Sequence, residues 1–190
     1  MTTLAPTIYT LAFPRAAGWL RDVTLILLGA VFVAVLAQVK IALPFTPVPL
    51  TGQTFAVLLV GATLGSKRGA TSMALYIALG ALGLPVFAGG ESGVAYLSGA
   101  TLGYLVGFVI AAYVIGLLAE RGLERSVRTS LIPFFVGTTI IYVCGVAWLA
   151  VVLGSFSKAI MAGLLPFLIA DAIKIIAAAL VLPGAWKFVR

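Results

Sequence analysis

Residues 97–119, LSGATLGYLVGFVIAAYVIGLLA, decide the fold class of this chain. The segment carries no charged residue, and it is apolar almost throughout. A helix that crosses the hydrocarbon core of a bilayer needs about 20 predominantly apolar residues, and this segment is long enough to supply them. A strand of a membrane β-barrel would instead alternate apolar and polar residues. The segment therefore predicts a membrane-spanning α-helix.

Further apolar runs extend this pattern along the chain. We expect an all-α, polytopic membrane protein with a bundle of six transmembrane helices, at residues 23–41, 53–65, 69–84, 97–119, 132–153 and 166–182. These helices leave no room for a soluble domain, so residues 1–190 are interpreted as a single integral membrane domain. The run 53–65 is the shortest. It either spans fully, with help from earlier residues or burial by its neighbours, or re-enters on the same side.

The composition agrees with a lipid environment. The chain is 63% hydrophobic and 9% charged, whereas a soluble domain carries roughly 25% charged residues and needs a polar exterior. Cys144 is the single cysteine, which excludes a disulfide scaffold, and the chain has no histidine. A histidine-based metal or acid–base site is therefore excluded.

The basic residues predict the orientation in the membrane. With six crossings, nine of the twelve fall on one side: Arg15, Arg21, Lys67, Arg68, Arg121, Arg125, Arg128, Lys187 and Arg190. Lys40 and Lys158 fall on the other side. The positive-inside rule then places both termini in the cytoplasm. The net charge of +7 therefore indicates topology and lipid contact rather than nucleic-acid binding.

Two ionisable residues lie inside the last apolar run. Asp171 and Lys174 are three residues apart, so they share one face of a helix. Charges at membrane depth are costly and mark candidate functional sites, and a buried ion pair seldom adds net stability. If this helix begins at Pro166 on the outer side, both residues lie in the outer half of the membrane. Either Lys174 binds an anionic group and Asp171 accepts N–H donors in a pocket, or the pair only fixes helix packing.

Two outer loops are able to close such a pocket. The first, residues 43–53, contains three prolines that keep it stiff and extended. The second, residues 85–98, is rich in glycine. The polar and aromatic residues near the pocket are expected to contact the ligand, and the alternative for each is solvation or packing: Thr51, Gln53, Phe87, Thr101, Tyr104 and Tyr142.

Other patterns narrow the class of protein. Ala30 and Ala34 form a small-residue stripe on the first helix, which suits either a partner helix or internal packing. The chain has no G-x-x-x-x-G-K-[ST] phosphate loop, no metal-ligand cluster and no Ser-His or Cys-His pair. We expect no catalytic residue, no metal and no cofactor, so the chain is predicted to bind or transport a ligand rather than to act as an enzyme.

Four stretches resemble one known family. They are PVPLTGQT at 47–54, GLPVFAGG at 83–90, GATLGYLVGF at 99–108 and LPFLIADAIK at 165–174. In this order they resemble the BioY family, the biotin-binding membrane subunits (S components) of energy-coupling-factor transporters. Ala100 departs from the family pattern, which has proline there, and residues 87–99 lack the asparagine that the family often carries.

The resemblance implies a function and a set of partners. It implies biotin as the ligand, high-affinity uptake, and a multi-pass location in a bacterial inner or plasma membrane. It implies a transmembrane coupling subunit and two cytoplasmic ATPases, which accounts for the missing phosphate loop. Asp171 and Lys174 match the family's biotin contacts, Ala30 and Ala34 match its docking residues, and residues 44–53 match its lid. The alternative is a small self-sufficient carrier or channel for biotin or another vitamin.

Overall fold

The computed structural model describes residues 18–189, with side chains through Leu182. Both chain ends, with Arg15, Arg190 and the side chain of Lys187, lie outside the described residues. The elements are α2 (Gly18–Ala37), β1 (Lys40–Ile41), β2 (Leu50–Thr51), α3 (Gln53–Leu64), α4 (Ser66–Ala81), α5 (Val94–Leu97), α6 (Leu102–Ala119), α7 (Val127–Leu153), α8 (Phe156–Gly163), the 3₁₀ turn η1 (Leu165–Phe167) and α9 (Leu168–Val189).

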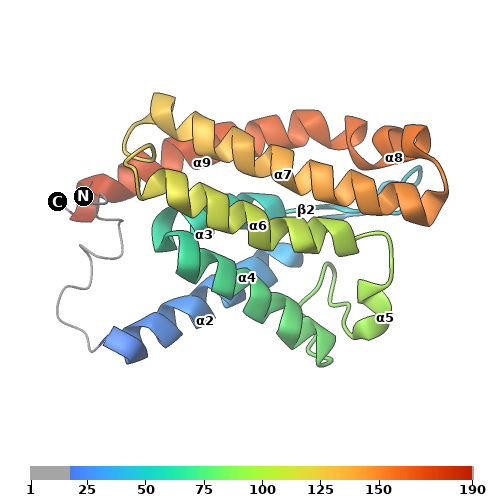
Figure 1. Ribbon diagram of the computed structural model, residues 1–190, viewed down its shortest axis with the longest axis horizontal. Helices are drawn as coiled ribbons and strands as arrows, with labels where there is room; N and C mark the ends of the chain where they lie inside the picture. Colours follow the sequence, from blue (N-terminus) through green and yellow to red (C-terminus); the bar gives the residue numbers. More distant parts are fainter. Residues whose placement is uncertain (1–17, 190) are drawn as a thin grey trace.

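Helices α6, α7 and α9 run roughly along the long axis of the molecule, and α2 and α4 lie obliquely to it (Figure 1). The two short strands gather with α5 and α8 at one end, which we call the hairpin end. The α3–α4 junction and the α6–α7 loop lie at the opposite end, which we call the basic end because it carries Lys67, Arg68, Arg121, Arg125 and Arg128. The molecule is therefore mostly helical, with its two ends clearly different in charge.

Four segments of the described chain are long and apolar enough to cross a membrane: Gly18–Ala37, Leu102–Ala119, Val127–Leu153 and Phe156–Leu182. The helix α3 is apolar but has only 12 residues, which is about 18 Å at 1.5 Å per residue. Its residues are mostly buried, because α4, α6 and α9 pack around it. A helix covered by protein on most sides does not have to match the thickness of the lipid.

The helix boundaries differ from the expected ones where turns and strands intervene. The helix expected at 23–41 ends at Ala37, because Lys40 pairs with Thr51 and Ile41 with Leu50 in an antiparallel hairpin. The run 97–119 is broken between α5 and α6. The fifth helix begins early, at Val127, because the side chain of Ser126 accepts a hydrogen bond from the N–H of Thr129 and caps it.

The last run also begins differently from the expectation. Pro166 lies in the 3₁₀ turn η1, and the α-helical part starts at Leu168. This shift places Asp171 in the first turn of α9. The backbone N–H groups and the dipole at a helix N-terminus favour a negative charge there.

Glycines allow α6 and α7 to approach closely. A Cβ atom at Gly103 would collide with the backbone of Cys144, and one at Gly107 would lie 3.0 Å from Cα of Ile141. A Cβ at Gly145 would collide with the ring of Tyr104. These glycines therefore serve internal helix packing.

Candidate functional site

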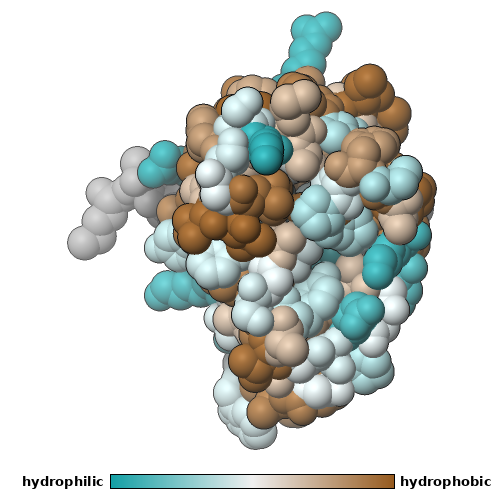
Figure 2. Space-filling view, turned by 90° about the vertical axis from the view of Figure 1, so that its right-hand side faces the viewer, coloured by the Kyte–Doolittle hydropathy of each residue, from teal (hydrophilic) through white to brown (hydrophobic). Residues whose placement is uncertain are grey.

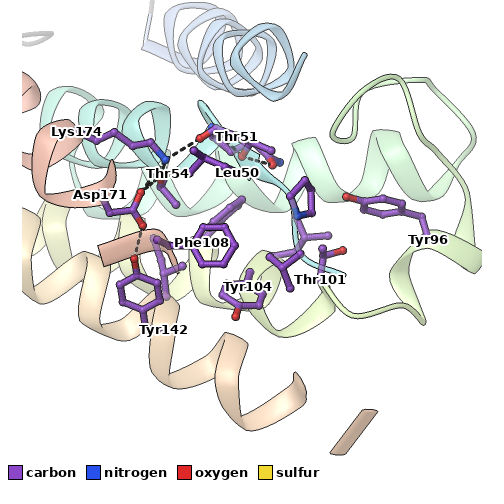
Figure 3. A pocket seen from close by; sticks show the side chains of 16 residues that line it. Leu50, Thr51, Thr54, Tyr96, Thr101, Tyr104, Phe108, Tyr142, Asp171 and Lys174 are labelled. Atoms are coloured by element: carbon purple, nitrogen blue, oxygen red, sulfur yellow. Dashed lines mark hydrogen bonds and ion pairs between the residues drawn. The ribbon is translucent and has the colours of Figure 1, made fainter. Parts of the chain in front are cut away.

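Lys174 on α9 is held by three acceptors near the hairpin (Figure 3). Its Nζ donates to Oδ1 of Asp171 at 2.7 Å, to Oγ1 of Thr54 at 2.8 Å and to the carbonyl oxygen of Thr51 at 2.7 Å. An ammonium group has three N–H donors. Each of them is therefore used inside the protein, and the lysine head is fixed in position.

Asp171 accepts from two more elements. The hydroxyl of Tyr142 on α7 donates to Oδ2 at 2.6 Å, and the hydroxyl of Thr54 on α3 lies 3.1 Å from Oδ1. The carboxylate is buried, with 5% of the residue exposed. A buried charge is tolerated when it is paired and hydrogen-bonded. The cluster of Thr54, Tyr142, Asp171 and Lys174 thus joins three helices at one point.

This cluster forms one wall of a cavity that we call the inner pocket. The pocket lies between the hairpin, α3, α6, α7 and α9 and has a volume of about 50 Å³. Its other walls are apolar and aromatic, and they include Leu105, Phe108, Ile141 and Phe167. A few polar groups among apolar walls is the composition of a typical small-molecule site.

The structure brings most of the predicted site residues together. The inner pocket is lined by Thr51, Gln53, Thr101, Tyr104, Tyr142, Asp171 and Lys174. Phe87 does not line this pocket: it is fully buried and stacks on Tyr96 at a ring-centroid distance of 4.7 Å. Its ring supports two residues that border the site: Tyr96, which lines the pocket, and Tyr76, which bonds to Gln53.

Two of the lining residues direct their polar atoms into the protein. Nε2 of Gln53 donates to the hydroxyl of Tyr76 at 2.7 Å, and its Oε1 accepts from Thr51 at 2.9 Å. The hydroxyl of Tyr104 donates to the carbonyl oxygen of Gly163 at 2.7 Å. These side chains therefore position the walls, while the Asp171–Lys174 pair supplies the charges.

Sequence reasoning missed Thr54 and Tyr96 as members of the site. Thr54 bridges the lysine and the carboxylate, and its only signal in the sequence was a hydroxyl in the first turn of an apolar helix, beside Gln53. The apolar residues of the pocket walls could not be identified from the sequence, because neighbouring positions in the same helices are equally apolar. Burial raises the pKa of the Tyr96 phenol above its ordinary value, which agrees with its packing on Phe87.

The two expected docking residues of α2 differ in exposure. Ala30 is 1% exposed, and Ala34 is half-buried. The neighbouring Gly29 lies against Ser72 of α4, so the part of the stripe around Ala30 packs inside the bundle. The exposed face of α2 carries larger side chains such as Leu28, Val31 and Val35 instead.

Fold and site together define a helical membrane protein with a pocket near one end of its bundle. The model of the BioY family matches residues 5–190, and the chain belongs to the BioY family. The named relatives are transporters, not enzymes.

Three comparisons illustrate the relationship. The chain is 43% identical to the "Probable biotin transporter BioY" of Pyrococcus horikoshii over 81% of this chain and 89% of that protein. It is 38% identical to the "Biotin transporter BioY" of Rhizobium etli over 84% of this chain and 90% of that protein. Its structure matches the crystal structure of the S-component for biotin from an ECF-type ABC transporter, with a TM-score of 0.81, 25% identity, and coverage of 90% of this chain and 95% of that chain.

Proposed function

We propose that this chain is the biotin-binding membrane subunit of an energy-coupling-factor transporter. It binds biotin with high affinity and takes it up together with a transmembrane coupling subunit and two cytoplasmic ATPases. The observation that carries the proposal is the buried Asp171–Lys174 pair in the inner pocket. This pair lies in a chain whose family relatives are named biotin transporters.

The chemistry of the pocket fits biotin. The vitamin has an anionic carboxylate, a ureido head with N–H donors and an apolar bicyclic core. Lys174 offers a cation, Asp171 offers an acceptor, and aromatic side chains cover the core. We assign Thr51, Gln53, Thr101, Tyr104 and Tyr142 as further substrate-binding residues, because they line the same walls.

We assign residues 1–190 to one membrane domain with six crossings, formed by α2, α3, α4, α6, α7 and α9. Both termini and the basic end face the cytoplasm of a bacterial plasma membrane, and the hairpin end faces outward. The cluster of basic side chains at one end supports this orientation. Single cysteines at positions 67 and 158 in a Cys144→Ala background test it with a membrane-impermeant maleimide in intact cells. The orientation predicts labelling at 158 only.

Tritiated biotin binding to the purified protein in nanodiscs tests the proposed ligand and site. We expect saturable binding by the wild type and strongly weakened binding in Asp171→Asn and Lys174→Ala. Lys158→Ala, an exposed lysine outside the pocket, should bind normally. Unchanged affinity in both pocket variants would refute the site, and a wild type that binds a different vitamin would refute the ligand.

Proteoliposomes distinguish this subunit from a self-sufficient carrier. We expect the chain alone to bind biotin without net uptake, and co-reconstitution with the coupling subunit and ATPases to restore ATP-driven uptake. Uptake by the chain alone would favour the carrier.

The coupling subunit is expected to dock on α2. Since Ala30 is covered, first contact would fall on the exposed face with Leu28, Val31 and Val35, with Ala34 at its edge. Val31→Trp should then reduce ATP-driven uptake and leave biotin binding intact. Val181→Trp, an exposed position on α9, is the matched control.

A further inference from the structure

A second hollow opens at the hairpin end, on the outer side of the inner pocket. It has a volume of about 370 Å³ and is lined by the hairpin and by the segment that leads into α6. Pro49, Tyr96 and Thr101 line both this hollow and the inner pocket. We call the outer hollow the vestibule. Figure 2 looks onto this end and shows hydrophilic residues set among hydrophobic ones.

The two hollows differ in size. Sites for small molecules usually measure about 300–1,000 Å³. The vestibule, at about 370 Å³, falls in this range, whereas the inner pocket, at about 50 Å³, has room for only a few water molecules. The vestibule therefore has room for a ligand of vitamin size, whereas the inner pocket in this conformation does not.

Two charged side chains line the vestibule. Lys40 belongs to β1 and Glu91 to the loop before α5, and both are exposed. Among residues 18–189 neither side chain takes part in an ion pair. Both charges are therefore available to a ligand.

A glycine leaves space for the side chain of Lys40. A Cβ at Gly89 would lie 2.6 Å from Cδ and 3.0 Å from Nζ of Lys40. Gly89 has a φ of +74° and donates its N–H to the carbonyl oxygen of Ala37 at 3.3 Å. The backbone therefore leaves a space that the lysine stem fills, and it ties this loop to the end of α2.

The hairpin connects this lysine to the inner one. Lys40 pairs with Thr51 across the two strands, and the carbonyl oxygen of Thr51 accepts from Nζ of Lys174. One short hairpin thus carries a cation in the vestibule and helps to hold the cation of the inner pocket. Each hollow combines one lysine with one carboxylate, Lys40 with Glu91 and Lys174 with Asp171.

We propose that the vestibule is a first binding site for the anionic ligand. Lys40 attracts the carboxylate, and Glu91 repels it, so that the anionic end settles on the lysine side. The ligand then passes between Pro49 and Tyr96 into the inner pocket. The identity of the ligand rests on the proposed function. A charge used at the encounter acts mainly on the association rate.

Association kinetics of biotin with the protein in nanodiscs test the vestibule. Lys40→Met should lower the association rate constant by about 3–10-fold at low salt and leave the dissociation rate constant within about twofold. The association rate of this variant should also depend less on salt than that of the wild type, because the variant lacks the lysine charge whose attraction for the ligand salt screens. Lys40→Arg should restore the rate, and Glu91→Gln should raise it.

Lys158→Met is the matched control, because Lys158 is an exposed lysine on α8 at the same end and does not line the vestibule. It should associate like the wild type. An unchanged association rate in Lys40→Met, an equal loss in Lys158→Met, or a change confined to dissociation would overturn the vestibule. A wild type that does not bind biotin would instead overturn the proposed function.

Discussion

The hydroxyl of Tyr142 donates a 2.6 Å hydrogen bond to Oδ2 of Asp171 and thereby joins α7 to α9. Both residues line the inner pocket and also a groove of about 660 Å³ between α7, α8 and α9. The pair therefore forms the wall between the pocket and this largely apolar groove. Its loss would loosen the wall and release the carboxylate from its position.

Tyr142→Phe tests this wall. A hydrogen bond to a charged group contributes about 1.5–3 kcal/mol. We expect a lower thermal midpoint and biotin affinity reduced by about tenfold, which corresponds to about 1.4 kcal/mol. Tyr113→Phe, at an exposed tyrosine of α6, should change neither quantity. Equal effects in the two variants would show that the wall contributes nothing specific.

The Asp171–Lys174 pair should behave as a coupled unit. Removal of one partner leaves a buried charge without compensation and costs about 3–5 kcal/mol, whereas removal of both is far less destabilising. We expect Asp171→Asn and Lys174→Met each to lower the thermal midpoint strongly. The double variant should recover most of that loss without recovering biotin binding.

The pair Asp22–Arg68 at the basic end is the comparison for this experiment. Its oxygen–nitrogen distance is 2.8 Å, but 37% of the Asp22 side chain and 22% of the Arg68 side chain are exposed. Partly exposed pairs contribute about 0–1 kcal/mol. Asp22→Asn should therefore have a small effect, and a loss as large as that of Asp171→Asn would contradict the role of burial.

Gly116 marks a close approach of α6 to the α3–α4 junction. A Cβ there would collide with the backbone of Gly65 and Ser66, which cannot rotate away. Gly116→Ala should therefore lower the free energy of unfolding by about 1–3 kcal/mol. Gly184→Ala has open space around it and should be neutral or stabilising by about 0.5–1 kcal/mol. Denaturant titration in detergent micelles measures the free energy of unfolding of both variants. The prediction fails if both glycine substitutions change it with the same sign.

Glu124 should make stability depend on pH. It lies in the loop between α6 and α7, is fully buried, and among the described residues neither carboxylate oxygen has a hydrogen-bond partner. Burial raises the pKa of its carboxyl group to about 7, although the positive charge of Arg125 acts in the opposite direction. Between pH 4.5 and 7 the folded protein therefore holds this proton more tightly than the unfolded chain.

The free energy of unfolding should fall by at most about 3 kcal/mol as the pH rises through this window. Above the window it should level off. Glu124→Gln should remove the dependence and raise the thermal midpoint at pH 8, where the wild type carries the buried charge. Thermal unfolding followed by tryptophan fluorescence from pH 5 to pH 8 measures this. Glu91→Gln, at an exposed carboxyl, should keep the wild-type profile, and a flat wild-type curve would contradict the prediction.

The helical class followed from the sequence because lipid imposes continuous apolar runs, and the runs are unmistakable in residues 97–119 and 132–153. The boundaries did not follow in the same way. The hairpin at Lys40–Thr51 and the break between α5 and α6 depend on strand pairing and turns. These features do not change the mean hydropathy of a segment. The buried state of α3 likewise depends on its neighbours.

For the site, the sequence predicted the charged residues but not which neighbouring side chains they contact. Asp171 and Lys174 were conspicuous because charges inside an apolar run are costly. Thr54 was inconspicuous, because a hydroxyl costs little in a helix and its role exists only where α3 meets α9. Ala30 carried a spacing that suits a partner helix as well as internal packing, and only the packing of α2 against α4 placed it inside.

The sequence by itself determined that this protein lies in a lipid bilayer, that it is helical, and which two charged residues mark its site. It could do so because hydropathy and charge are local properties. The tertiary structure decided which side chains meet around those charges. It decided that Thr54 and Tyr142 hold the pair, that Phe87 packs on Tyr76 and Tyr96, and that a wider hollow adjoins a narrow inner pocket. Such contacts join residues far apart in the chain, and no local pattern encodes their distances.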